Sequence, residues 1–124
     1  MKTIVLIFCL FLMGCTSENN DSEVFIGKIT GIGSLTNITL GESDTITVTF
    51  SGGNDGCAKP DHLEAAFAGT TISFKAYYNY PVHPTICTEN IPIHQLKYTF
   101  KPTSRGNYTY RSFDTDASAE TKVN

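Results

Sequence analysis

Apolar and polar residues alternate along most of the chain from residue 24 onward. In residues 45–50, Ile46, Val48 and Phe50 alternate with three threonines. A period of two that is rich in β-branched residues is typical of a half-buried strand. The same alternation predicts strands over residues 71–77, 95–100 and 107–113, and weaker strands over residues 24–30 and 35–40.

Glycine and proline residues separate these segments, and no segment predicts a convincing helix. Residues 62–68 are ambiguous, because Leu, Glu and Ala favour a helix while the stretch between Pro60 and Gly69 is too short for a stable one; a short strand or a single turn is expected. About seven strands at this spacing predict an all-β fold, an antiparallel β-sandwich or barrel.

The C-terminal third carries two further expectations. Residues 98–110, with a turn at residues 101–107, are expected to form a β-hairpin. Residues 114–124 are polar, so the final strand is expected to be weak, with an edge open to pairing with another chain.

The first residues have the composition of an export signal. Lys2 is followed by an apolar run over residues 4–13 and then by small residues. As a helix this run would rise only about 15 Å, half the thickness of a bilayer core, so a transmembrane span is not expected. A buried N-terminal helix is the alternative interpretation.

Residues Leu12-Met13-Gly14-Cys15 resemble the lipobox of bacterial lipoproteins. The resemblance implies that residues 1–14 are a lipoprotein signal peptide and that Cys15 becomes a lipidated N-terminus carrying palmitate-type acyl chains. Residues 15–23 are polar and predict a flexible tether, and residues 24–124 form the domain. Acidic residues after Cys15 also resemble the surface-export signal of Bacteroidota lipoproteins. The expected location is the bacterial cell envelope, at the outer membrane, with the lipid as anchor.

Two further cysteines, Cys57 and Cys87, lie within the domain. An exported pair of cysteines tends to form a disulfide, because the compartment is oxidising. A disulfide is therefore expected, with a free thiol or metal pair as the alternative. Neither cysteine belongs to a CxxC motif.

Residues 104–110 resemble the D-x-G-x-Y-x-C segment that enters strand F of immunoglobulin domains. Gly106 and Tyr108 match this segment, while Ser104 replaces Asp and Tyr110 replaces Cys. The resemblance implies an immunoglobulin-like β-sandwich in which Tyr108 forms a tyrosine corner, its hydroxyl bonding to upstream backbone. A core aromatic is the alternative role for Tyr108. The chain as a whole resembles small Bacteroidota lipoproteins with immunoglobulin-like domains.

Charge and motifs argue against several function classes. The formal charge is −3, and it becomes about −4 when Lys2 leaves with residues 1–14, so nucleic acid is not an expected partner. Asp61, His62 and Glu64 form the densest polar cluster, but no HxH, HExxH or GxSxG motif is present. No catalytic residue, metal or cofactor is expected, and the protein is not expected to be an enzyme.

The segment YYNYPVHP, residues 77–84, is the most distinctive candidate surface. Tyr78, Tyr80 and His83 are expected to form a contact patch on a proline-stiffened loop leading to Cys87, since exposed tyrosines are common in recognition surfaces. Packing of this loop against the sheet is the alternative. The expected function is binding or assembly at the envelope, with an envelope protein or a glycan as partner. A small envelope enzyme or a protease inhibitor presenting the loop 78–87 is the alternative function.

Overall fold

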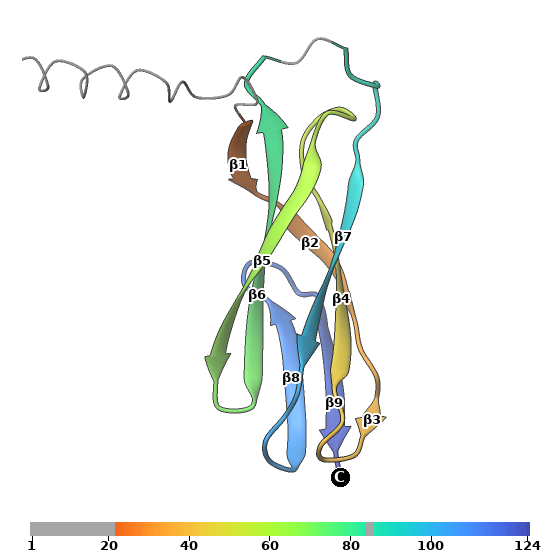
Figure 1. The fold of residues 1–124 in the computed structure, drawn as a ribbon, viewed down its shortest axis with the longest axis vertical. Coiled ribbons are helices and arrows are strands. Elements are labelled where there is room, and N and C mark those ends of the chain that lie inside the picture. Colours follow the sequence, from red (N-terminus) through yellow and green to blue (C-terminus); the bar gives the residue numbers. More distant parts are fainter. Residues whose placement is uncertain (1–21, 84–85) are drawn as a thin grey trace, which may run out of the picture.

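The computed structural model describes residues 22–83 and 86–124, and these residues form nine β-strands in two sheets (Figure 1). The expected signal peptide, Cys15 and most of the tether lie outside the described residues. Within the described residues, no helix is long and apolar enough to cross a bilayer. The strands are β1 (Ser22–Ile26), β2 (Lys28–Gly33), β3 (Asn37–Ile38), β4 (Asp44–Ser51), β5 (Lys59–Ala68), β6 (Thr71–Pro81), β7 (Ile93–Phe100), β8 (Gly106–Ser112) and β9 (Ser118–Val123).

The larger sheet has the order β1-β6-β8-β9-β3, with β5 also paired to β6, and the smaller sheet has the order β2-β4-β7. Five of the seven strand pairings are antiparallel, whereas β3–β9 and β6–β8 are parallel. The all-β prediction is confirmed, and the two sheets are consistent with a β-sandwich. The expectation of a purely antiparallel fold is wrong at the two parallel pairings.

The core lies between the two sheets and follows the predicted alternation. Ile46, Val48 and Phe50 of β4 are buried, as are Ile72 and Phe74 of β6. Aromatic rings pack against one another between the sheets. Phe74 of β6 and Tyr98 of β7 make an edge-to-face contact, with ring centroids 5.3 Å apart. Such contacts contribute roughly 0.5–1.5 kcal/mol beyond the area they bury.

The first predicted strand, residues 24–30, is in fact two strands that belong to different sheets. β1 pairs with β6, β2 pairs with β4, and Gly27 lies between them. A Cβ at Gly27 would lie 2.6 Å from Cδ2 of Phe50, so the chain can pass this close to the core only with glycine. The stretch VFIGKIT contains no proline and no turn motif, and Gly27 is its one irregular residue, so the sequence pattern does not reveal the crossing.

The predicted hairpin over residues 98–110 is wrong, because β7 and β8 lie in different sheets. Residues 101–105 instead carry the chain from one sheet to the other. The Tyr108 hydroxyl donates a hydrogen bond to the backbone oxygen of Ser104 at 2.9 Å, which is the upstream backbone contact expected of a tyrosine corner. Tyr108 is also buried in the core, so both of its expected roles are combined.

Three weaker expectations also have clear outcomes. Residues 62–68 form a strand, within β5, whereas the weak strand over residues 35–40 shrinks to β3. The expectation of a weak, open final strand is wrong only in part: β3 pairs with β9 at Lys122 and Val123 alone, but Thr121 and Val123 are buried. A buried hydroxyl is tolerated in β9 because it has hydrogen-bond partners.

The Thr121 hydroxyl lies within hydrogen-bond distance of the backbone oxygen of Leu35 and the hydroxyl of Ser34. It also contacts the wholly buried carboxylate of Asp44, the first residue of β4. Its Oδ2 accepts hydrogen bonds from the hydroxyls of Tyr110 and Thr121, both at 2.9 Å, and its Oδ1 accepts one from the backbone N–H of Leu35 at 3.2 Å. Burial raises the pKa of Tyr110 to about 12, so its hydroxyl remains a proton donor. Asp44 thus connects β4 of the smaller sheet to β8 and β9 of the larger one.

Replacing Asp44 by alanine should therefore lower the free energy of unfolding by about 3–5 kcal/mol, because it leaves buried donors without an acceptor. Denaturant titration followed by circular dichroism measures this loss. Asp116→Ala, at an exposed position in the turn before β9, is the matched control and should change stability by less than about 0.5 kcal/mol. Equal effects of the two substitutions would contradict the proposed importance of the buried network.

Candidate functional site

One end of the domain, here called the β1 end, is formed by β1, the loop of residues 52–58 and the connection between β6 and β7 (Figure 1). The predicted disulfide between Cys57 and Cys87 joins these two loops, with a Cα–Cα distance of 5.2 Å. Asp55, Cys57 and Cys87 are the one group of three potential metal ligands that converges within the described residues. Because both sulfurs are in the disulfide, neither is available as a thiolate ligand.

Tyr78 of the expected contact patch is largely a packing residue. Its ring stacks on Phe25 at 5.6 Å and on His94 at 6.2 Å between ring centroids. Gly52 lies against the same ring, and a Cβ there would be only 2.2 Å from Cδ1 of Tyr78. The residue therefore holds β1 and the 52–58 loop against β6, and is only half-exposed.

Tyr80 and His83, the other members of the expected patch, have different surroundings. The Tyr80 hydroxyl donates to Oδ2 of Asp55 at 2.6 Å, and this hydrogen bond raises the pKa of Tyr80. Tyr78 and Tyr80 line a hollow of about 280 Å³ with Phe25, Gly53, Asn54 and Asp55, whereas His83 is exposed on the following loop and does not line it. Because β6 extends to Pro81, the first residues of the expected loop 78–87 belong to the sheet.

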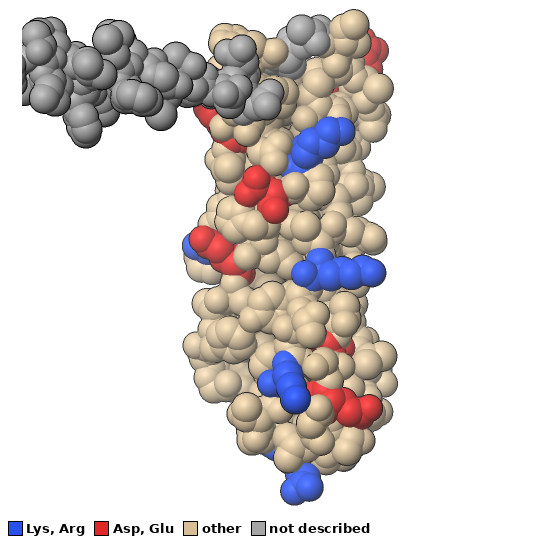
Figure 2. Space-filling model, in the orientation of Figure 1, with Lys and Arg blue, Asp and Glu red and all other residues tan. Residues whose placement is uncertain are grey.

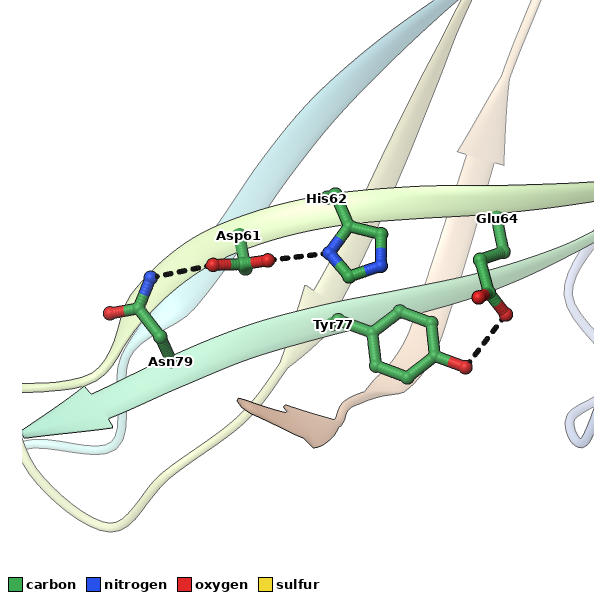
Figure 3. Close-up of polar contacts among 5 residues, drawn as sticks. All are labelled: Asp61, His62, Glu64, Tyr77 and Asn79. Atoms are coloured by element: carbon green, nitrogen blue, oxygen red, sulfur yellow. Dashed lines mark hydrogen bonds and ion pairs between the residues drawn. The ribbon is translucent and has the colours of Figure 1, made fainter. Parts of the chain in front are cut away.

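A second group of polar and aromatic residues lies on the outer face of β5 and β6 (Figure 3). The register of the two strands shifts between Pro60 and His62, so Asp61 is an extra residue in β5. This bulge brings the Asp61 carboxylate beside His62, its own neighbour in the chain, with an Oδ2–Nδ1 distance of 2.5 Å. The amide of Asn79 donates to the other Asp61 oxygen at 3.0 Å.

The aromatic partner of this group is Tyr77 of β6. Its ring stacks on the His62 ring, with centroids 4.6 Å apart and planes at 9°, and its hydroxyl donates to Oε1 of Glu64 at 2.8 Å. The hydrogen bond to Glu64 raises the pKa of Tyr77, while the hydrogen bonds from Asn79 and His62 lower the pKa of Asp61. At neutral pH the group therefore presents an ionised carboxylate beside an uncharged phenol.

A hollow of about 370 Å³ adjoins this group and shares Glu64 with it. The hollow is also lined by the outward-facing Ser73 and Lys75 of β6 and by Phe113, which is 60% exposed. The Lys75 ammonium lies over the Phe113 ring, 4.1 Å from its centroid. The outer-face site is defined here as this hollow together with Asp61, His62, Glu64, Tyr77 and Asn79.

The chemistry of the outer-face site suits binding better than covalent catalysis. A carboxylate hydrogen-bonded to Nδ1 of a histidine is one half of a Ser-His-Asp triad. In the part of the chain that the structure describes, however, no Ser, Thr or Cys side chain is hydrogen-bonded to His62, and the Tyr77 hydroxyl is directed to Glu64. The site instead offers carboxylate acceptors, an amide, an ammonium and exposed rings on one open face.

The sequence identifies only part of this site. Asp61, His62 and Glu64 form a polar cluster in the sequence, and the structure places them together. Sequence reasoning placed Tyr77 and Asn79 in the candidate segment 77–84 but did not join them to this cluster, and it missed Phe113, since the proximity of all three depends on the bulge in β5 and on the strand order. The outward position of Tyr77 in the alternating segment 71–77 was the available signal.

The structure predicts opposite consequences for two neighbouring tyrosines. Tyr78→Ala should lower the free energy of unfolding by about 2–4 kcal/mol, because it opens a cavity between β1, Gly52 and His94. Tyr77→Ala, the matched control on the outer face, should leave the free energy of unfolding close to that of the wild type. Thermal and denaturant unfolding of both variants measures the difference, and equal losses would show that Tyr77 also supports the core.

No protein-family model matches the chain, and neither a curated protein nor a solved structure was found to be similar to it. The function is therefore inferred from the residues and their geometry.

Proposed function

We propose that the protein is a lipid-anchored component of the bacterial cell envelope that binds a glycan on its outer face and performs no catalysis. The observation that carries the anchor is the sequence Leu12-Met13-Gly14-Cys15, which resembles a lipobox and ends seven residues before β1 begins at Ser22. Acyl chains on Cys15 would bury many CH₂ groups, at about 0.8 kcal/mol each, and so hold the domain at a membrane.

The disulfide supports export of the domain. Disulfides persist in oxidising compartments and are rare in the cytosol. The Cys57–Cys87 bridge closes a loop with a sequence separation of 30 residues, for which the chain-entropy model gives a stabilisation of roughly 3–4 kcal/mol. A small domain with a modest core benefits from such a cross-link.

The composition of the outer-face site favours a glycan as its ligand. Sugars present many hydroxyls, which can donate to the carboxylates of Asp61 and Glu64, together with C–H faces that pack on aromatic rings. Phe113 and Tyr77 supply rings, and Lys75 and Ser73 supply donors along the same strands. Acidic and basic side chains are interspersed on the face shown in Figure 2, which does not favour a highly charged polymer as ligand.

We also propose that the domain is a divergent immunoglobulin-like sandwich. The chain crosses between sheets from β7 to β8 and Tyr108 bonds to the backbone at this crossing, as in immunoglobulin domains. The antiparallel β8–β9 pair would correspond to strands F and G. The parallel pairing of β6 with β8 departs from the immunoglobulin pattern, in which strands C and F are antiparallel.

Cys15→Ser should abolish acylation, because the thiol is the acceptor of the first lipid. Bacteria expressing either form are fed an alkyne analogue of palmitate, and the label and the membrane fraction are measured. The wild-type chain should carry label and sediment with membranes, whereas the variant should be unlabelled and extractable without detergent. Cys9→Ser is the matched control and should behave as wild type. An unlabelled wild-type chain would contradict the anchor.

Phe113→Ala and Tyr77→Ala should each weaken glycan binding at least about tenfold while leaving the unfolding midpoint close to wild type. Binding of the detergent-solubilised full chain to an array of bacterial envelope oligosaccharides measures this. Lys97→Ala, exposed on β7 of the other sheet, is the control and should bind as wild type. Failure of the wild-type chain to bind any oligosaccharide, combined with cross-linking of this face to an envelope protein, would replace the glycan by a protein partner.

A further inference from the structure

The β1 end carries an exposed apolar surface that the proposed glycan site does not use. Ile86 is 89% exposed, Ile91 69%, Ile93 73% and Val82 42%. All four belong to the connection between β6 and β7 or to the first residue of β7. We call these four residues the apolar tip.

The apolar tip is nearly free of charge. Within residues 86–93 the single charged side chain is Glu89, and within residues 22–26 it is Glu23. The adjoining residues 52–59 contain Asp55, whose carboxylate accepts from the Tyr80 hydroxyl, and Lys59. Exposed branched aliphatic side chains without interspersed charges are uncommon on the surface of a soluble monomer, and such patches mark contacts with another protein or with lipid. No basic cluster accompanies the tip among the described residues, so electrostatic attraction to anionic headgroups is not what would hold it there.

The tip lies at the point where the chain from Cys15 enters the domain. Ser22, the first residue of β1, is paired with Pro81, which directly precedes Val82 of the tip. Seven Cα–Cα steps separate Cys15 from Ser22, and at about 3.3–3.6 Å per residue they span at most about 25 Å. The β1 end therefore cannot move farther than this from an acyl anchor on Cys15.

The opposite end of the domain is not held in this way. β6 has 11 residues and extends over roughly 36 Å at the rise of a strand, so the turn between β5 and β6 lies toward the opposite end of the long axis (Figure 1). The tether thus raises the effective concentration of lipid at the apolar tip much more than at the other end.

We infer that the apolar tip rests in the interfacial region of the bilayer that holds the acyl chains of Cys15, so that the domain stands on the membrane on its β1 end. This inference rests on the lipid anchor proposed above. Ile86 and Ile91 enter the headgroup–acyl boundary, while the outer-face site, which runs along the strands, remains open to the side. Contact between the tip and the bilayer would fix the orientation of the domain, which the acyl anchor alone would leave free to rotate.

Single tryptophans can report the position of the tip, since the natural chain contains no Trp. Full-length protein carrying Ile91→Trp, or Ile86→Trp as a second probe, is purified from bacterial membranes and reconstituted into phosphatidylethanolamine–phosphatidylglycerol vesicles. Each preparation is divided in two, and one half is reconstituted with lipids that have brominated acyl chains. Bromine quenches the fluorescence of nearby indole rings. Phe67→Trp is the matched control, because Phe67 is also exposed, at 57%, but lies beside the β5–β6 turn at the opposite end.

The inference predicts that the indole in the Ile91→Trp and Ile86→Trp variants loses much of its emission with brominated lipids. In vesicles, this indole should also emit at a shorter wavelength than it does in the same variant after its acyl chains are removed and the protein is dissolved in detergent-free buffer. The indole in the Phe67→Trp variant should show neither effect. Thermal unfolding of each variant confirms that the fold is retained.

Intact-mass measurement of the same samples separates two failures. An acylated protein in which neither tip indole is quenched would overturn the membrane-facing tip and leave the anchor in place. A protein without acyl mass would overturn the anchor and the inference together.

Discussion

The buried carboxylate of Asp44 constrains how the two sheets of this domain can pack. A charged group without solvent is tolerated only when donors surround it. Those donors come from Tyr110 on β8, Thr121 on β9 and the backbone of Leu35, so residues 35–44 must meet a strand pair that lies 66 to 77 residues farther along the chain from Asp44. The network adds a requirement to the apolar packing of the two sheets, because each donor must lie at hydrogen-bond distance and in a suitable direction from the carboxylate. The C-terminal strand, although polar, is held in the fold by the same contacts.

The position of β6 follows from this packing, and β6 shares the proposed binding face with β5. Its inward side chains, Ile72, Phe74 and Ala76, complete the core, while Ser73, Lys75 and Tyr77 alternate with them on the outer face. A rigid inner face therefore fixes the spacing of the outer residues. The bulge at Asp61 adds a second carboxylate to that face without disturbing the core register of β5 beyond it, since Leu63 still pairs with Ala76.

Local sequence pattern predicted the faces of the strands well but not their partners. The alternation in β4 and β6 correctly identified which residues are buried, because burial on a pleated strand depends only on the period of two. The sheet to which a strand belongs depends on distant residues. The crossing at Gly27 is marked by no proline or turn motif, and the connection between β7 and β8 has the length and composition of a hairpin loop although it joins two sheets. The burial of Thr121 depends on Asp44, which lies 77 residues away in the sequence.

The candidate site was partly predictable for the same reason. Asp61, His62 and Glu64 are neighbours in the chain, while Tyr77, Asn79 and Phe113 join them only through the strand order.

The arrangement of the ends would allow the proposed anchor and the proposed binding face to act in one small domain without interfering. β1 pairs with the C-terminal half of β6, so a chain leading from Cys15 joins the domain beside the strand that bears Tyr77 and Asn79. A load on a bound ligand would pass along β6 to β1 through backbone hydrogen bonds, and the disulfide and the stacked Tyr78 reinforce the end at which it arrives. Because the proposed binding face runs parallel to the strands and the chain enters the domain at one end, a membrane and a ligand would occupy perpendicular surfaces. A domain standing on its β1 end would hold that face out from the bilayer at a fixed height, which a flexible tether alone could not do.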